Sequence, residues 1–394
     1  MFLNDEQQLI RDTLREFLEN EIAPDLPEAD RKPLTKEEVI DYQTRLGELG
    51  FGPGATGEDA GFSEPLEYVI ASEEIGRVWA SLVPAINMSY PVQFAPYAGQ
   101  RTRDAVGDLV EAGEAVGCMA VTEPAGGSDT RNIATTAEKD GDEWVINGEK
   151  TWVSNATIAD VALVVAHNAE TDQRGYFLVD KETAPWETRE LNKLGWKGSP
   201  TGQMFFDDCR IPAENELMTL VGNMVSEGGA SMTENPMFQN QNPLNALFAY
   251  MRTGMAAMAV GIMQAALEAA QEYALEREVF GGPIGGHQLI QDKLYNIKAW
   301  TETSRQLTYH AAEAVQQGHG DARLLSSLAK GWVCERSVDA TKEALQVYGG
   351  NGLATDYPLE RYYRDAITMT IPDGTTEIQK MVVGYEMTGI GAYK

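Results

Sequence analysis

Hydrophobic positions along the chain change their period twice, which predicts three structural parts. Up to about residue 117, apolar residues recur at helical spacing, first behind an N-cap pattern at residues 4–7 and then over residues 39–49 and 66–81. After Cys118, short β-branched and aromatic runs separated by Gly and Pro indicate strands. Helical spacing then returns in three long stretches and two shorter ones, at 251–278, 287–317, 321–348, after 356 and at 375–386.

These changes predict the domain organisation. We expect an N-terminal α-helical domain over residues 1–117, a middle β domain over 118–222, an extended connecting segment over 223–245 and a C-terminal helical bundle over 246–394. Within the β domain, the pair Asn147-Gly148 is a strong signal for a two-residue turn, so a hairpin is expected around it.

Composition limits the class of protein. The 394 residues are 43% hydrophobic, which is enough to bury a large core. Charges interrupt the apolar runs before the ~20 residues that a membrane span needs, and the N-terminus lacks a signal-peptide pattern, so we expect a cytoplasmic protein without membrane insertion. Cys118, Cys209 and Cys334 are far apart and form no C-x-x-C, so we expect buried free thiols and no metal site.

The stretch from Cys118 to Asp129 is the first candidate for binding a ligand. It leaves an extended run at Thr122, must turn at Pro124, and then removes side-chain bulk at Gly126 and Gly127. Such a loop can lie against a flat ring or a phosphate, but from these residues alone an ordinary turn between strands explains it equally well. A formal G-x-G-x-x-G at residues 52–57 is rejected as a nucleotide motif, because a helical pattern precedes it and an acidic loop follows.

Several segments along the chain strengthen the first interpretation when they are taken together. They are Val-Thr-Glu-Pro-Ala-Gly-Gly-Ser-Asp (121–129), Trp-Val-Ser-Asn (152–155), Glu-Arg-Glu-Val-Phe-Gly (276–281), His-Gln (287–288), Gln-Val-Tyr-Gly-Gly-Asn-Gly (346–352) and Arg-Asp (364–365). In this order they resemble the motifs of the acyl-CoA dehydrogenase family of flavoenzymes. The resemblance implies an α+β fold with N-terminal helices, a middle β-barrel-like domain and a C-terminal four-helix bundle.

The resemblance also implies a set of residues that bind FAD. Thr122 and Ser154 would hydrogen-bond the flavin ring, and Trp152 would form a wall beside it. Arg277 and Gln346 would reach the pyrophosphate of FAD held by a neighbouring subunit, which requires an oligomer, by implication a homotetramer. The full implied set is Thr122, Ser128, Trp152, Ser154, Arg277, Phe280, Gln288, Gln346, Gly350, Thr375 and Glu377. Glu377 replaces an amide that is common in the family, and His287 is interpreted as a structural residue.

The catalytic base differs from the family pattern. The family has a Glu in a motif that aligns with Pro372-Asp373-Gly374-Thr375, so Asp373 is the candidate base. An Asp holds its carboxylate roughly 1.5 Å nearer the backbone, and such a misplacement can cost on the order of 10²-fold in rate. The alternative is that Asp373 only caps the following helix. The implied substrate-binding residues are Ser128, Arg252 and Gly374, and Met251 excludes the position at which some relatives carry their base.

Three functions fit these residues. The first is an FAD-dependent acyl-CoA dehydrogenase that desaturates an acyl-CoA thioester and passes electrons to an electron-transfer flavoprotein. The second is a flavin oxidase of the nitroalkane-oxidase kind, which also uses an Asp as base. The third is a non-catalytic acyl-CoA-binding relative. The connecting segment, which in the family lies beside the acyl pocket, either shapes the substrate space or is a flexible surface loop.

Net charge leads to a prediction about salt. Sixty acidic residues against 31 basic residues give a net charge of −29, which argues against nucleic acid and anionic membranes as partners. At 1 M salt the Debye length falls to about 3 Å, so salt screens the repulsion between these acidic residues. We therefore expect a halophilic protein. Its free energy of unfolding, measured from low to molar KCl, should rise with the salt concentration. A free energy of unfolding that does not rise would indicate an ordinary acidic enzyme.

Overall fold

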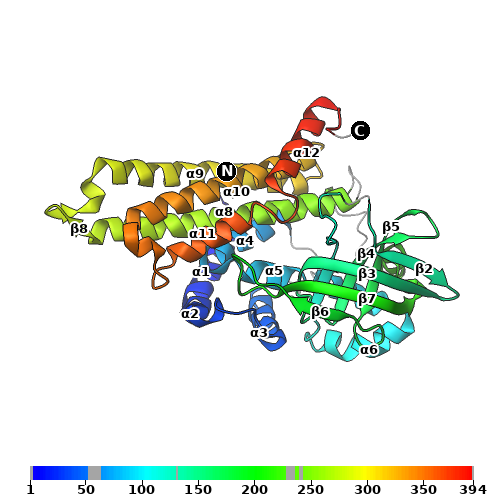
Figure 1. Cartoon of the computed structure of the whole chain (residues 1–394). Helices are drawn as coiled ribbons and strands as arrows, with labels where there is room; N and C mark the ends of the chain where they lie inside the picture. The colour runs from blue at the N-terminus through cyan, green and yellow to red at the C-terminus, as the bar shows by residue number, and fades with distance from the viewer. Residues whose placement is uncertain (1–2, 52–63, 130–131, 228–235, 239–242, 393–394) are drawn as a thin grey trace.

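The computed structural model describes residues 3–51, 64–129, 132–227, 236–238 and 243–392. A sheet domain lies at one end of a long helical body, and helices α8, α9 and α10 run side by side along that body (Figure 1). This order of helices, sheet and helices confirms the α+β fold expected from the change of period. The rejected nucleotide motif at residues 52–57 lies outside the described residues.

The N-terminal part is helical. Its main helices are α1 (Asp5–Phe17), which continues as a π-helix (Leu18–Ile22), α2 (Leu26–Ala29), α3 (Lys36–Gly47), α4 (Pro65–Trp79), α5 (Leu82–Asn87) and α6 (Gln100–Glu111). The capping box predicted at the start is present, since Asn4 accepts from the Gln7 amide and the Gln7 side chain accepts from the Asn4 amide.

The middle domain is a seven-stranded sheet in the order β1-β4-β2-β3-β7-β6, with β5 paired to β4. Its strands are β1 (Gly117–Ala120), β2 (Thr136–Asp140), β3 (Glu143–Ser154), β4 (Val161–Asn168), β5 (Gln173–Asp180), β6 (Glu187–Glu190) and β7 (Thr201–Pro212). Cys118 and Cys209 are buried in it and Cys334 is buried in the helical body, all three as free thiols, as predicted.

The hairpin expected around Asn147-Gly148 is wrong. Both residues lie inside β3, where the pairing with β7 shifts its register between Ile146 and Gly148. Gly148 has a φ of 145°, and a Cβ there would lie 2.6 Å from the Thr135 hydroxyl oxygen. Gly148 therefore allows a register shift within the continuous strand β3, at a point where Thr135 lies very close to its backbone. The actual turn lies earlier, at Gly141 and Asp142 between β2 and β3.

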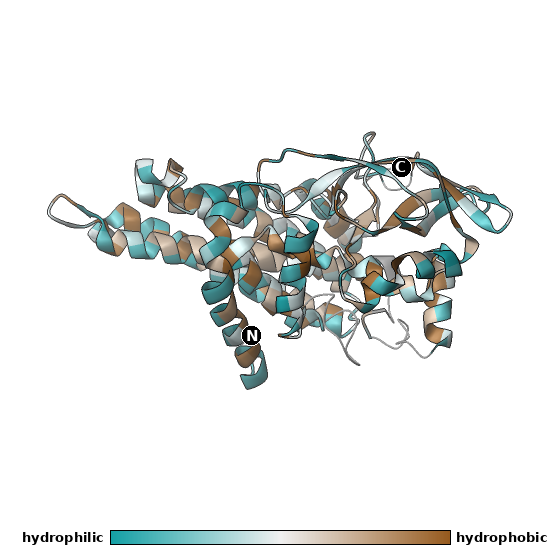
Figure 2. Ribbon diagram, turned by 90° about the horizontal axis from the view of Figure 1, so that it is seen from below, coloured by the Kyte–Doolittle hydropathy of each residue, from teal (hydrophilic) through white to brown (hydrophobic). Residues whose placement is uncertain are grey.

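Helix α8 is the central helix of the C-terminal part. After α7 (Leu217–Ser226), the C-terminal helices are α8 (Pro243–Glu276), α9 (Gln288–Gln316), α10 (Ala322–Tyr348), α11 (Leu359–Thr368) and α12 (Thr376–Thr388), with a small β8–β9 hairpin (Glu278–Val279, Gly282–Pro283) after α8. Brown apolar residues are most frequent where these helices meet, and teal residues mark the outer faces (Figure 2). In the described chain α8 is long and apolar enough to cross a membrane, but 89% of its apolar window is buried, as in the core helix of a folded domain.

Buried polar groups fasten the sheet domain to α11. Asp365 on α11 is 2% exposed and accepts a hydrogen bond of 2.7 Å from the Trp196 amide, in the loop between β6 and β7. Asp30 binds the Trp79 indole at 2.9 Å and faces Arg364 at 3.5 Å. Burial and the nearby charge of Asp30 raise the pKa of Asp365 to about 7, against the attraction of Arg361 and Arg364.

This shift predicts a pH dependence of stability. The folded chain binds the Asp365 proton more tightly than the unfolded chain, whose carboxyl has a pKa of about 3.9. The stabilisation by this proton is complete below that value and is lost as the pH rises through about 7. Asp365→Asn keeps an acceptor for the Trp196 amide but does not titrate. The free energy of unfolding of the variant relative to the native protein should therefore increase by a few kcal/mol between pH 4 and 8, at about 1.4 kcal/mol per pKa unit.

Urea denaturation at several pH values measures this difference, and the exposed Asp356→Asn is the matched control. If Asp365→Asn and Asp356→Asn gave parallel pH profiles, Asp365 would have no special role in the pH dependence.

Candidate flavin and acyl-CoA site

A buried ion pair holds the loop that was the first candidate for ligand binding. Lys150 on β3 is fully buried, and its Nζ lies 2.7 Å from Glu123 Oε1. Glu123 also accepts from the Thr135 hydroxyl at 2.6 Å and from the backbone amides of Ala134 and Thr135. Burial raises the pKa of Glu123, but these hydrogen bonds, led by that of Lys150, outweigh it and bring the pKa to about 2. Glu123 is thus a fixed anion that anchors the turn at Pro124.

The residues of the sheet domain that are predicted to contact the flavin lie close to the Glu123–Lys150 ion pair. The Thr151 amide donates to the Thr122 carbonyl at 2.8 Å, so the loop runs beside the end of β3. Trp152 lies in a second register shift of β3, has a left-handed φ of 59° and exposes 60% of its side chain. Within the described chain, the hydroxyls of Thr122 and Ser154 have no hydrogen-bond partner. An exposed indole and two free hydroxyls fit the face and edge of a flat polar ring.

Ser128 is exposed near the end of the described loop. Asn155 follows directly after β3. It is fully buried, has a φ of 63° and donates to the carbonyls of Ala85 and Gly117. It fixes the end of β3 against the N-terminal helices, a role that follows from the tertiary structure and was not part of the sequence analysis.

Asp373 lies between α11 and α12 and does not cap α12. Thr375 is the N-cap, and its hydroxyl accepts from the Ile378 amide, so the capping alternative for Asp373 is wrong. Thr375, predicted to bind the cofactor, has its hydroxyl engaged in this cap. Asp373 and Gly374 both have positive φ, 55° and 91°, which turns the chain sharply before the helix begins. A left-handed non-glycine residue is a strained conformation that often marks a functional position.

The surroundings of Asp373 are cationic and aromatic. Although the residue keeps some exposed surface, burial of its carboxyl group raises its pKa, and the charges of Lys330 and Arg252 oppose the rise. Arg252 on α8 is 9% exposed, and its pKa falls to about 10 because of burial, with Asp373 opposing the fall. Burial raises the pKa of Tyr68 and Tyr90, and the charge of Asp373 adds to both shifts.

Tyr90 connects Asp373 to the flavin half of the site. Its hydroxyl lies 2.7 Å from the Met119 sulfur, on the strand that leads into the loop at Thr122. The Arg252 guanidinium donates to the Ser327 hydroxyl at 3.2 Å, while its buried Nε has no partner among the described residues. Gly374, predicted to contact substrate, and the exposed Glu377 follow Asp373 directly. The structure therefore brings together the residues predicted in the loop, in β3 and around Asp373.

The remaining predicted cofactor residues lie at the opposite end of the helical body. Arg277 lies between α8 and β8, and Phe280 lies at the tip of the β8–β9 hairpin, which projects from the end far from the sheet (Figure 1). Phe280 is 96% exposed and Arg277 and Gln288 are also exposed. Arg252 and Arg277 are 25 residues apart on one helical course, which at 1.5 Å per residue is roughly 37 Å. Within one chain, Arg252 and Arg277 are therefore too far apart to contact the same part of one ligand.

The end of α10 belongs to this distant group. Tyr348 stacks on Tyr273 of α8 with ring centroids 3.9 Å apart, and Asn351 donates to the Tyr273 hydroxyl at 3.0 Å. This contact places the exposed Gln346 and Gly350 beside the C-terminal end of α8. His287 precedes α9 and its ring meets that of Phe280 edge to face, far from Asp373.

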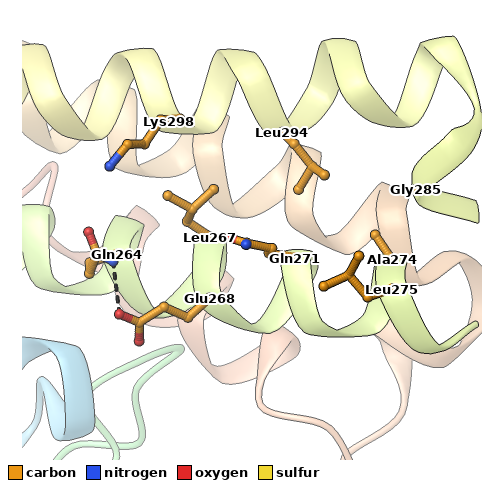
Figure 3. Close-up of a pocket in the computed structure, with 9 residues that line it drawn as sticks. All are labelled: Gln264, Leu267, Glu268, Gln271, Ala274, Leu275, Gly285, Leu294 and Lys298. Atoms are coloured by element: carbon orange, nitrogen blue, oxygen red, sulfur yellow. Dashed lines mark hydrogen bonds between the residues drawn. The ribbon is translucent and has the colours of Figure 1, made fainter.

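A groove of about 460 Å³ opens between α8 and α9 in this same distant region (Figure 3). Leu267, Leu275 and Leu294 give it an apolar floor, and the Gln264 amide donates to Glu268 at 2.8 Å at its rim. None of the groups around Asp373 lines it. The groove is therefore distinct from the place where acyl chemistry is expected.

Two functional lysines were missed by the sequence analysis. Lys150 and Lys330 are both fully buried, one behind the flavin loop and one behind Asp373. The signal for Lys330 was its position on the apolar stripe of α10, between Ala329 and Val333, where a solvated lysine does not belong. For Lys150 the local sequence gave no such signal, because its neighbours Glu149 and Thr151 are polar as well.

Comparison with known proteins agrees with this geometry. The N-terminal, middle and C-terminal domain models of acyl-CoA dehydrogenases match residues 4–100, 118–209 and 243–388. The chain is 33% identical over 390 residues to the mitochondrial short-chain specific acyl-CoA dehydrogenase of Mus musculus, covering 97% of this chain and 90% of that protein. It is 32% identical over 403 residues to the glutaryl-CoA dehydrogenase of Desulfococcus multivorans, covering 98% of each.

Among solved structures, one described as an electron transferring flavoprotein of Acidaminococcus fermentans superposes with a TM-score of 0.83 at 27% identity, over 98% of this chain and 99% of that one. The three domain models and relatives matched over 90% or more of their length agree on one family. The chain therefore belongs to the acyl-CoA dehydrogenase family and is an oxidoreductase.

Proposed function

We propose that this acyl-CoA dehydrogenase uses FAD to desaturate the α,β bond of a short acyl-CoA thioester and passes the electrons to an electron-transfer flavoprotein. The observations that carry the proposal are the partly buried Asp373 with its left-handed backbone, whose pKa is raised by burial and lowered by the charges of Lys330 and Arg252, and the loop with free hydroxyls and an exposed indole. A short acyl group is proposed because the relatives named above act on short-chain acyl-CoA and glutaryl-CoA. The electron acceptor is proposed from the family and from a similar structure that is described as an electron transferring flavoprotein.

The chain's own residues supply the proton chemistry and the positioning. Asp373 takes the α-proton of the thioester, and burial makes its carboxylate a stronger base than an exposed Asp. Arg252 and Lys330 favour the ionised form that can accept the proton. Thr122 and Ser154 hold the edge of the flavin ring, and Trp152 covers one side. When bound, the flavin supplies the acceptor for the β-hydrogen, which leaves as hydride.

The distribution of residues favours an oligomer, which we propose to be a homotetramer. Arg277, Phe280, Gln288, Gln346 and Gly350 lie at the end of the helical body far from Thr122 and Ser154. A guanidinium fork such as that of Arg277 is suited to a pyrophosphate. These residues complete the FAD site of a neighbouring subunit, because they are too far away to complete their own. We also propose a cytoplasmic location, on the sequence pattern alone.

Substitution of Asp373 tests the proposed reaction. Asp373→Asn keeps the shape of the side chain but accepts no proton, so flavin reduction by an acyl-CoA should be abolished while FAD stays bound. Asp373→Glu moves the carboxylate outward by one C–C bond; if the pocket is built around Asp, the reduction rate should fall on the order of 10²-fold. Anaerobic stopped-flow bleaching of the flavin with a panel of C4 to C8 acyl-CoA thioesters measures both, with Asp356→Asn as the exposed control.

Admitting air after the bleaching separates the possible functions. A reduced flavin that is stable in air and reoxidised by an electron-transfer flavoprotein is expected. Rapid reoxidation with formation of peroxide would indicate an oxidase, which the Asp base makes the second candidate. No bleaching of the native protein by any thioester would contradict the dehydrogenase.

Mixed subunits test whether the FAD site is shared. Asp373→Asn removes the base and Arg277→Glu should release FAD, so each variant alone should be inactive. In hybrids, a chain with native Asp373 can meet native Arg277 from its neighbour, and random 1:1 mixing should restore about one quarter of the sites. Coexpression with two affinity tags followed by activity and FAD measurements gives this fraction. Hybrids without activity would place both residues in the site of one chain.

A further inference from the structure

The side chain of Lys330 is buried beside the loop that carries Asp373. It extends from α10, is fully inaccessible to solvent, and is among the largest completely buried side chains in the described chain. Its Nζ donates to the carbonyl of Gly374 at 2.7 Å and to the carbonyl of Thr370 at 3.2 Å. These two carbonyls stand on either side of Asp373. One ammonium group therefore joins the two ends of the loop.

This arrangement differs from an ordinary buried ion pair. In the described residues no carboxylate lies within 4.0 Å of the Lys330 ammonium, and its hydrogen-bond partners are the two backbone carbonyls. A buried cation needs hydrogen bonds to offset its lost hydration, and neutral carbonyls offset it less completely than a carboxylate does. A hydrophobic side chain of similar length would fill the same space without this cost. The charge and the donors therefore call for an explanation beyond packing.

The backbone that Lys330 holds is strained. Asp373 and Gly374 both adopt positive φ, and the Gln379 amide also donates to their carbonyls, at 2.9 Å and 3.0 Å. The Gly374 carbonyl thus accepts from Lys330 and Gln379 together. A non-glycine residue stays in a left-handed conformation only where its surroundings enforce it. The direction of the Asp373 side chain depends on this enforced turn.

We propose that Lys330 is a positioning residue for the reaction, which orients Asp373 by holding the carbonyls of Thr370 and Gly374. Its charge also acts on the Asp373 carboxylate. This inference rests on the proposed role of Asp373 as the base. The ionisable groups that face Asp373 come from four elements: Tyr68 from α4, Tyr90 from the helix at 90–97, Arg252 from α8, and Lys330 and Cys334 from α10. Of these, Lys330 also binds the loop itself.

Two substitutions separate orientation from charge. Lys330→Met keeps the length of the side chain but removes both its donors and its charge. Lys330→Gln keeps one donor and removes the charge. With the same holoenzyme assay, Lys330→Met should reduce the flavin on the order of 10²-fold more slowly, as expected for a misplaced base, and Lys330→Gln should be less impaired. In both variants the acid limb of the pH–rate profile should move to higher pH, because a cation that favours the Asp373 carboxylate is missing.

Gln379→Met and Lys342→Met are the controls. Gln379→Met loosens the same carbonyls without changing a charge, so it should slow reduction and leave the acid limb in place. Lys342→Met removes an exposed cation from the same helix and should change neither quantity. FAD content and subunit assembly should match the native protein in all four variants.

Amide hydrogen exchange of the loop 370–376 provides a readout independent of activity. Loss of one hydrogen bond corresponds to about fivefold faster exchange, and Lys330→Met loses two, so its loop should exchange at least about tenfold faster than that of Lys342→Met. Should Lys330→Met not fold, Lys330→Gln supplies a comparison of the same kind with a smaller expected increase in exchange, because it keeps one donor. A native reduction rate with an unmoved acid limb in either folded Lys330 variant would overturn the proposal. A failure of the dehydrogenase assignment shows instead in the native protein, as flavin that no acyl-CoA bleaches.

Discussion

The close contact between α4 and α8 is the constraint on which the helical body depends. A Cβ on Gly261 would overlap the carbonyl oxygen of Glu73, and one on Gly76 would lie 2.7 Å from the Met258 backbone. Only glycine permits this approach of the two backbones. The contact lies at the middle of α8, which is otherwise rich in alanine and methionine. With α4 pressed against its middle, α8 can also pack against α9, α10 and α11. The N-terminal helices and the bundle therefore share one hydrophobic core.

This packing holds the two ends of α8 far apart. The distance limits which residues of one chain can act at the same site. At one end, Arg252 interacts with the charge of Asp373; at the other, Arg277 and Phe280 are exposed to solvent. A rigid helix of 34 residues cannot bring these groups together. Large exposed apolar and cationic groups on such an end are more consistent with contacts to another subunit than with a solvated tip. The proposed division of one ligand site between two chains is consistent with this length.

Buried charges fasten the functional loops onto this frame. Glu123 with Lys150 holds the flavin loop, Lys330 holds the turn at Asp373, and Asp365 ties α11 to the sheet domain. Each of these groups fixes the position of a neighbouring segment of the chain. Buried polar groups stabilise less than apolar packing would, yet they accept only a narrow range of geometries, which suits segments that must be placed to within a fraction of an ångström.

The sequence by itself determined the order of helical and β parts, the first capping box, the long helices and the residue types of the flavin loop, because periodicity and capping are local properties. Tertiary structure decided the rest. Asn147-Gly148 forms a bulge and not a turn because Thr135, distant in the local pattern, lies against Gly148. Thr375 and not Asp373 caps α12 because Lys330 and Gln379 hold the preceding carbonyls in a left-handed turn. Which cation reaches which carbonyl depends on contacts between helices, and no local pattern encodes them.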